Sequence, residues 1–244
     1  MAEPLSRIFL LSHMRAFTSL AGHILGSHPR INGYFEMHLA YEHAAALDEQ
    51  LGLFTQREPI KPGSRYLFDK LLHNAYRLGP EALCGVELRL LVSLARPERT
   101  LKSIVSLFRQ NDPEHDWASP EGAVRYYVGR LQYLARFCKS STVPFLYYDA
   151  ELLREAAPRW LSGVSEWLEL DSPLSERYRT FARTGEARCG DSSPAIRAGR
   201  VLAGTSDYSD VHLPVEVCGQ AQEAYQAFRP QIVAHAAVVL DLVD

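Results

Sequence analysis

The fold is decided by the stretch RIFLLSHMRAFTSLAGHILGSHP, residues 7–29. Residues 7–12 form a compact apolar run that ends in polar residues, which is typical of a buried strand. Residues 18–27 follow with apolar side chains at a helical spacing, and His28-Pro29 ends this predicted helix. The chain therefore opens with a strand, a short loop and a helix.

The same arrangement occurs twice more. Residues 88–95 (LRLLVSLA) have the near-continuous hydrophobicity of a central parallel strand, and a helix-like segment follows over 100–109. Residues 143–148 (VPFLYY) predict an aromatic-rich strand before a helical stretch over 151–161. Three strand-then-helix units predict an α/β fold with a central parallel sheet flanked by helices.

The remaining segments are less regular. Residues 37–83 are expected to be mostly helical, with a loop over 58–63, and residues 171–213 are rich in Gly, Ser, Asp and Pro, which predicts a long and partly irregular excursion. Residues 216–243 are expected to form one or two closing helices. No repeat, low-complexity tract or linker divides the chain, so we expect one domain over 1–244.

Composition excludes several classes of protein. The chain has 244 residues, with 26 Lys and Arg against 29 Asp and Glu, and this balance argues against binding to nucleic acid or to a membrane surface. No apolar run approaches the roughly 20 residues of a membrane span, and the N-terminus has no signal-peptide cleavage site. The four cysteines form no CxxC pair, which indicates reduced thiols and a cytoplasmic location.

Polar clusters follow three predicted strands, where ligands bind in open parallel sheets. The third of them contains Glu36 and lies just after a strand expected within 30–35. The first cluster offers the guanidinium of Arg15, the hydroxyls of Thr18 and Ser19 and a helix N-terminus, which together favour an anion. An ordinary helix cap with a solvated arginine would show the same residues, and the cluster lacks the Gly-x4-Gly-Lys-Ser/Thr pattern of a nucleoside-triphosphate P-loop. The second cluster has Arg96 and Ser103 at the start of another helix, where they could hold one phosphate from two sides or belong to a charged helix start.

Taken together, these clusters resemble the sulfotransferases that use 3′-phosphoadenosine 5′-phosphosulfate (PAPS), with a layout nearest to the tyrosylprotein-type and bacterial members. Residues 8–36 are similar to the 5′-phosphosulfate loop of that family, and residues 92–108 to its 3′-phosphate motif. Residues 147–153 (YYDAELL) and 190–200 (GDSSPAIRAGR) are similar to its Tyr-Glu-Asp-Leu strand end and to its late nucleotide-covering loop. The resemblance implies a P-loop-like strand–loop–helix site and sulfuryl transfer from PAPS to an acceptor hydroxyl, without a metal.

The resemblance also implies a set of donor-binding residues: Arg15, Ala16, Phe17, Thr18 and Ser19 for the 5′-phosphosulfate, Arg96, Ser103 and Arg197 for the 3′-phosphate, and Ser192 or Ser193 for the bridging oxygen. The sequence departs from the family pattern at two points. Phe17 stands where the family usually has glycine, so a turn with positive φ would be strained there. The spacing from Arg96 to Ser103 is seven residues, one fewer than usual.

The implied catalytic residues are Glu36, Arg15 and Lys70, with His38 as a rival base. Glu36 would take the acceptor proton, and burial against neighbouring rings would raise its pKa to help, whereas the imidazole of His38 needs less tuning. Arg15 and Lys70 would stabilise charge on the moving sulfuryl group. Without a catalytic role, Glu36 would be a solvated loop acid and Lys70 a surface helix lysine.

Other functions stay open at this point. A metal hydrolase would use Glu36, His38, Glu42 and His43, although no HExxH motif is present. A P-loop-like nucleotide kinase and a catalytically inactive nucleotide-binding module are two further candidates. Residues 37–66 and 110–130 are expected to line the acceptor pocket, and their aromatic, acidic and histidine side chains suit a small alcohol, a phenol or a carbohydrate equally. Neither the acceptor nor the oligomeric state follows from the sequence.

Overall fold

A computed structural model of the chain describes residues 4–83, 86–182, 184–185, 195–204 and 207–242. Within these residues, six parallel strands form one sheet in the order β2-β3-β1-β4-β5-β6. In chain order the elements are β1 (Ser6–Leu11), α1 (Thr18–Ser27), β2 (Ile31–Asn32), α2 (Ala45–Thr55), β3 (Tyr66–Leu71), η1 (Pro80–Leu83), β4 (Leu88–Leu94), α3 (Pro97–Asn111), η2 (Asp116–Ala118), α4 (Pro120–Ser140), β5 (Phe145–Asp149), α5 (Leu152–Glu155), α6 (Ala157–Trp167), η3 (Ile196–Ala198), α7 (Val215–Val233) and β6 (Val238–Leu240), where η marks a 3₁₀ helix. The predicted α/β fold with a central parallel sheet is confirmed.

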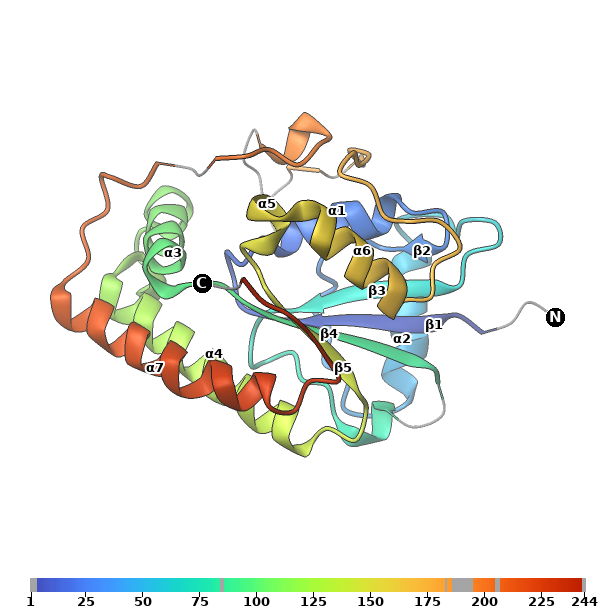
Figure 1. Ribbon diagram of the computed structural model, residues 1–244, viewed down its shortest axis with the longest axis horizontal. Coiled ribbons are helices and arrows are strands. Elements are labelled where there is room, and N and C mark those ends of the chain that lie inside the picture. The colour runs from blue at the N-terminus through green and yellow to red at the C-terminus, as the bar shows by residue number, and fades with distance from the viewer. Residues whose placement is uncertain (1–3, 84–85, 183, 186–194, 205–206, 243–244) are drawn as a thin grey trace.

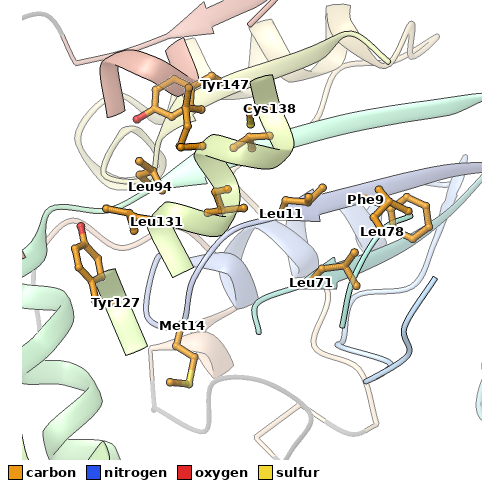
Figure 2. Close-up of a cluster of buried hydrophobic side chains, with 14 of the residues drawn as sticks. Phe9, Leu11, Met14, Leu71, Leu78, Leu94, Tyr127, Leu131, Cys138 and Tyr147 are labelled. Atoms are coloured by element: carbon orange, nitrogen blue, oxygen red, sulfur yellow. The ribbon is translucent and has the colours of Figure 1, made fainter. Parts of the chain in front are cut away.

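Helices cover both faces of the sheet (Figure 1). Alternate side chains of β1 point to opposite faces, as the pleat of a strand requires. Ile8 and Leu10 pack with residues of α1, α5 and α6, whereas Phe9 and Leu11 pack with residues of α3, α4 and α7. Figure 2 shows part of the cluster that contains Phe9 and Leu11, with Leu131 and Cys138 of α4 among its members. Because both faces are covered, β1 is buried along its whole length.

The carboxyl ends of β1 and β4 form the crevice in which such sheets bind ligands. β1 lies between β3 and β4, and the chain leaves β1 and β4 toward opposite edges of the sheet. His13 ties the two ends together, because its Nε2 accepts a hydrogen bond from the Ala95 N–H over 3.0 Å and its Nδ1 lies 2.8 Å from the Met14 carbonyl oxygen. Burial lowers the pKa of His13 to about 4, so this imidazole is neutral near pH 7.

Several predicted elements differ from the structure. The expectation of mostly helical structure over 37–83 is wrong for residues 66–71, which form the buried strand β3 beside β1. The strand expected within 30–35 has only two residues, Ile31 and Asn32. The closing segment contains a strand, β6, as well as the helix α7.

The helix predicted over 151–161 is divided into α5 and α6. The break falls at Ala156, whose φ of −145° and ψ of 51° are not helical. Pro158 follows at the start of α6, and its missing N–H could not have served a continuous helix. The short α5 therefore lies directly after the carboxyl end of β5, next to the crevice.

Two glycines let α1 lie directly against the segment that leads to Glu36. A Cβ at Gly22 would lie 2.4 Å from the Tyr34 carbonyl oxygen, and one at Gly26 would lie 2.5 Å from the Gly33 carbonyl oxygen. No real side chain tolerates such distances, so any substitution at either glycine would push α1 away from residues 33–34. This close packing sets the path of the backbone at residues 33–34, which directly precede Phe35 and Glu36.

Candidate active site

A cleft opens at the carboxyl ends of the strands, between the N-terminus of α1, the first turns of α3, and α5. Its empty space, part of which is open to solvent, is about 650 Å³. Its lining residues are Arg15, Phe17, Thr18, Ser19, Leu20, Arg99, Ser103, Arg154, Tyr178, Ala195, Ile196, Arg200 and Leu202. Within the described residues, this lining contains four arginines and neither Asp nor Glu, so the cleft is suited to an anion of more than one charge.

The helix α1 presents its N-terminus to the cleft. Its first intrahelical hydrogen bond runs from the Ala21 N–H to the Phe17 carbonyl oxygen, and the residues between them, Thr18, Ser19 and Leu20, line the cleft. No side chain of the described residues caps this helix. The positive end of the helix dipole therefore faces the same space as the arginines, an arrangement that favours phosphate or sulfate.

Arg15 connects the first predicted anion cluster with the second. Its Nε donates a hydrogen bond to the Ser103 Oγ over 2.7 Å, and the Ser103 hydroxyl donates to the Tyr208 oxygen over 2.8 Å. Arg15 follows β1 and Ser103 lies on α3, so two clusters that are far apart in the sequence form one site. Ala16 between Arg15 and Phe17 is completely buried and packs against Ala95 and Ala150.

Phe17 adopts the left-handed conformation in which the sequence predicts strain. Its φ is 53°, and that of Arg15 is 64°. For a residue with a Cβ this region costs about 1–2 kcal/mol relative to the right-handed one. Strain of this kind is often kept at functional sites because the surrounding structure enforces it. The Phe17 ring contacts two guanidinium groups, with 4.6 Å from its centroid to the Arg99 Cζ and 5.3 Å to the Arg154 Cζ.

Some predicted donor residues lie outside this lining. Arg96 is exposed, and its backbone N–H donates to the Glu151 Oε1 over 2.8 Å. The arginine of α3 that lines the cleft is Arg99, four residues before Ser103. Arg197 is exposed on η3, next to the lining residues Ala195 and Ile196. Ser192 and Ser193 lie outside the described residues.

Lys70 lies beneath the cleft, at the end of β3. Only 1% of it is exposed, and its Nζ lies 3.2 Å from the Ser19 Oγ at the start of α1. Asp69 beside it faces away from this contact and accepts hydrogen bonds from the Tyr41 hydroxyl and from the backbone N–H groups of Met37 and Lys70. Lys70 is therefore a buried strand residue at the site and not a residue of a surface helix.

Glu36 is buried within the electrostatic reach of Lys70. Only 7% of it is exposed, and its Oε1 has no hydrogen-bond partner among the described residues. Burial raises the pKa of Glu36 to about 7, while the positive charges of Lys70 and Arg130 and a hydrogen bond from the Leu72 backbone oppose that rise. The carboxyl group is therefore able to exchange a proton near neutral pH, as a general base must.

Two histidines approach this buried oxygen of Glu36. His38 Nδ1 lies 3.7 Å from the Oε1, and His73 Nε2 lies 4.0 Å from it. His38 is partly exposed and has a φ of 57°, whereas burial lowers the pKa of His73 to about 4 and keeps that ring neutral. The sequence predicts Glu36 and His38 at this place but gives no indication of His73.

Both histidines line a second pocket, which we call the aromatic pocket. Its lining residues are His38, His73, Asn74, Ala75, Tyr76, His115, Trp117, Arg125, Tyr126 and Gly129. The rings of His73 and Trp117 are stacked in parallel, with their centroids 5.5 Å apart. Tyr126 connects the pocket to the segments that follow β1 and β3, since its hydroxyl accepts from the Met14 N–H and donates to the Leu72 carbonyl, each over 2.8 Å.

The predicted acceptor segments contribute to this pocket only in part. Residues of the 110–130 segment line it, whereas from the 37–66 segment only His38 is among its described lining residues. In the described part of the chain, no three His, Cys, Asp or Glu side chains are arranged to hold a metal ion. None of the helices described there is both long enough and apolar enough to span a bilayer.

The sequence matches no protein-family model and no curated protein sequence. The structure is similar to the sulfotransferase domain from the curacin biosynthetic pathway, with a TM-score of 0.62 and 15% sequence identity over 93% of this chain and 99% of that domain. It is also similar to the sulfotransferase domain from the Synechococcus PCC 7002 olefin synthase, with a TM-score of 0.58 and 15% identity over 93% of this chain and 96% of that domain. The chain therefore has the sulfotransferase fold.

Proposed function

We propose that the protein is a sulfotransferase that moves a sulfuryl group from PAPS to a hydroxyl of a small-molecule or carbohydrate acceptor. One observation carries this proposal: Lys70 connects a cleft with four arginines at a helix N-terminus to a buried carboxyl group, since its Nζ contacts the lining residue Ser19 and its charge acts on Glu36. The cleft suits a doubly phosphorylated nucleotide, and the carboxyl group suits the proton of an acceptor. The sulfotransferase fold of the chain supports the same reaction class.

The donor would lie with its 5′-phosphosulfate at the N-terminus of α1. There Thr18, Ser19 and the backbone of residues 15–19 would bind the phosphate, and Arg15 and Lys70 would stabilise charge on the moving sulfuryl group. Ser103 would bind the 3′-phosphate, and Arg99 joins Arg96 as a candidate for its arginine, because Arg99 lines the cleft with Ser103.

The acceptor would enter through the aromatic pocket. Glu36 would take the proton of the acceptor hydroxyl while the acceptor oxygen forms a bond to sulfur. The bond between sulfur and the bridging phosphate oxygen would break at the same time, which leaves 3′-phosphoadenosine 5′-phosphate (PAP) and the sulfated acceptor. A sulfuryl group carries less negative charge than a phosphoryl group, so cationic side chains and N–H donors are able to stabilise its transfer.

The test is turnover of labelled PAPS. The protein is incubated with ³⁵S-labelled PAPS and separate pools of phenols, aliphatic alcohols and sugars, and both PAP release and transfer of label are followed. We expect label to pass to at least one pool, with an equal amount of PAP, and Glu36→Gln to abolish the transfer. Transfer of phosphate from ATP·Mg²⁺ without any turnover of PAPS would instead show that the cleft serves a kinase.

A further inference from the structure

We propose that Phe17 is a positioning residue whose ring holds the guanidinium groups of Arg99 and Arg154 over the anion position of the cleft. The inference rests on the proposed function in that the anion is taken to be a phosphate of the donor. It concerns a side chain that adopts positive φ directly before the N-terminus of α1.

The Phe17 ring lies within cation–π distance of two guanidinium groups. The Arg99 Cζ lies 4.6 Å and the Arg154 Cζ lies 5.3 Å from its centroid, both within the range of a cation–π contact. These arginines come from different elements, α3 and α5. Phe17 is therefore a common contact for two cleft arginines that reach the site from separate helices.

The positive charge of Arg99 lies close to those of Arg154 and Arg15, and a ring contact would stabilise it. Burial lowers the pKa of Arg99 and the positive charges of Arg154 and Arg15 lower it further, whereas Tyr208 and Glu151 oppose this change, so Arg99 is repelled by two neighbouring guanidinium groups. No carboxylate belongs to the described lining of the cleft. Among the described residues the buried Nε of Arg99 has no hydrogen-bond partner, and the Nε of Arg154 donates to the Leu202 carbonyl over 3.1 Å. The face of the Phe17 ring offers negative potential to both guanidinium groups, and the Tyr208 ring, 5.8 Å from the Arg99 Cζ, adds a second such contact for Arg99; both leave N–H groups available to a ligand.

The backbone conformation of Phe17 is unfavourable for a residue with a Cβ. With a φ of 53°, residue 17 lies where glycine would be free of strain and phenylalanine is not. A residue kept only for stability would not be expected at this position. The Phe17 side chain therefore positions the arginines of the cleft, and its positive φ lowers the stability of the fold.

The experiment compares stability and anion affinity across one series of variants, Phe17→Tyr, Leu, Ala and Gly. Calorimetry at fixed low salt measures binding of PAP and, separately, of inorganic pyrophosphate, and thermal unfolding gives Tm. We expect Tyr to bind within about threefold of wild type, and Leu, Ala and Gly to bind about tenfold more weakly, which corresponds to about 1.4 kcal/mol. Stability should follow a different order, with Gly above Ala in Tm, because only Gly is relaxed at positive φ.

A double-mutant comparison separates positioning from a general loss of structure. If the ring acts through the arginines, Phe17→Leu should weaken binding little further in a chain that already carries Arg99→Ala and Arg154→Ala. Glu169→Gly is the matched backbone control, since Glu169 also has positive φ but contacts Arg65 and Arg89 at the opposite ends of the strands. It should leave affinity for both anions unchanged.

The outcomes distinguish this inference from the proposed function. Wild-type affinity in Phe17→Leu, or affinities that simply follow Tm across the series, would overturn the positioning role. Binding of pyrophosphate but not of PAP, with the same dependence on the ring, would support the inference and overturn the proposed donor. If the wild-type chain binds neither anion, both the positioning role of Phe17 and the proposed donor are wrong.

Discussion

The Nε of Arg15 and the Oγ of Ser103 lie 2.7 Å apart, in hydrogen-bond contact across the crevice between β1 and β4. Arg15 belongs to the loop that follows β1, and Ser103 to the second turn of α3, 88 residues further along the chain. The contact makes one site of two helix starts, each of which alone would be an ordinary charged cap. The two predicted anion clusters are therefore parts of one cleft.

Arg99 and Arg96 are the two candidates for the arginine that would bind the 3′-phosphate of the proposed donor. We expect Arg99→Ala to weaken PAP binding by roughly 2 kcal/mol, the range of a lost hydrogen bond to a charged group, because Arg99 lines the cleft with Ser103. Arg96→Ala should weaken binding less than about threefold, since Arg96 is exposed and lies outside the described lining of the cleft. Titration calorimetry measures the PAP affinity of both variants. A larger loss of affinity in Arg96→Ala than in Arg99→Ala would assign the 3′-phosphate to Arg96.

The proposed base predicts a pH profile. Burial raises the pKa of Glu36 to about 7, so kcat/KM should fall about tenfold per pH unit below that value as the carboxyl group becomes protonated. Glu36→Gln should lower kcat by at least about 100-fold while PAP affinity is kept.

His38 provides the control for this assignment. His38→Gln should preserve the acidic limb of the profile if Glu36 is the base. An active Glu36→Gln variant, together with loss of the acidic limb in His38→Gln, would assign the proton transfer to His38 instead.

Lys70 should tune the same profile. Its positive charge lowers the pKa of Glu36 against the effect of burial. Replacement by an uncharged side chain in Lys70→Met should therefore move the acidic limb of kcat/KM to higher pH, by about one unit, in addition to lowering kcat. A profile that stays in place while kcat falls would mean that Lys70 acts on the donor alone and is electrostatically separate from Glu36.

His13 predicts how stability depends on pH. Its pKa is about 4 in the fold and near 6.5 in an unfolded chain, so the unfolded chain binds more protons between these values. His13 therefore contributes stability that is fully present above about pH 6.5 and is lost as the pH falls toward 4, worth roughly 3 kcal/mol in all. Chemical denaturation of wild type and His13→Gln across this range should show the difference between them grow with pH, and a constant difference would contradict the assignment.

Local patterns predicted the first strand and helix well. Residues 7–12 and 18–27 correspond to β1 and α1 because a buried parallel strand is apolar throughout and Pro29 excludes a longer helix. The strand β3 was missed because its sequence, YLFDKL, contains two charged residues that are almost completely buried in the fold. Asp69 accepts a hydrogen bond from Tyr41 and Lys70 contacts Ser19, and local hydrophobicity cannot reveal such buried polar contacts.

The candidate site was predictable only where its residues are close in sequence. Residues 15–19 lie together at the start of α1, as expected, but the aromatic pocket combines His73 with Trp117 from distant segments. Arg154 and Arg200 come from parts of the chain that no spacing pattern connects with the first loop. The sequence does indicate Arg99, because it precedes Ser103 by four residues and so lies on the same face of the helix.

The central claim is that one cleft holds both phosphates of a single adenosine nucleotide. Titration calorimetry with PAP, adenosine 5′-monophosphate and adenosine 3′-monophosphate under one salt condition tests it most directly. The account requires PAP to bind at least about 100-fold more tightly than either monophosphate, since each phosphate gains its own charged hydrogen bonds. Equal affinities for PAP and one of the monophosphates would show that only one phosphate is held, and the account would be wrong.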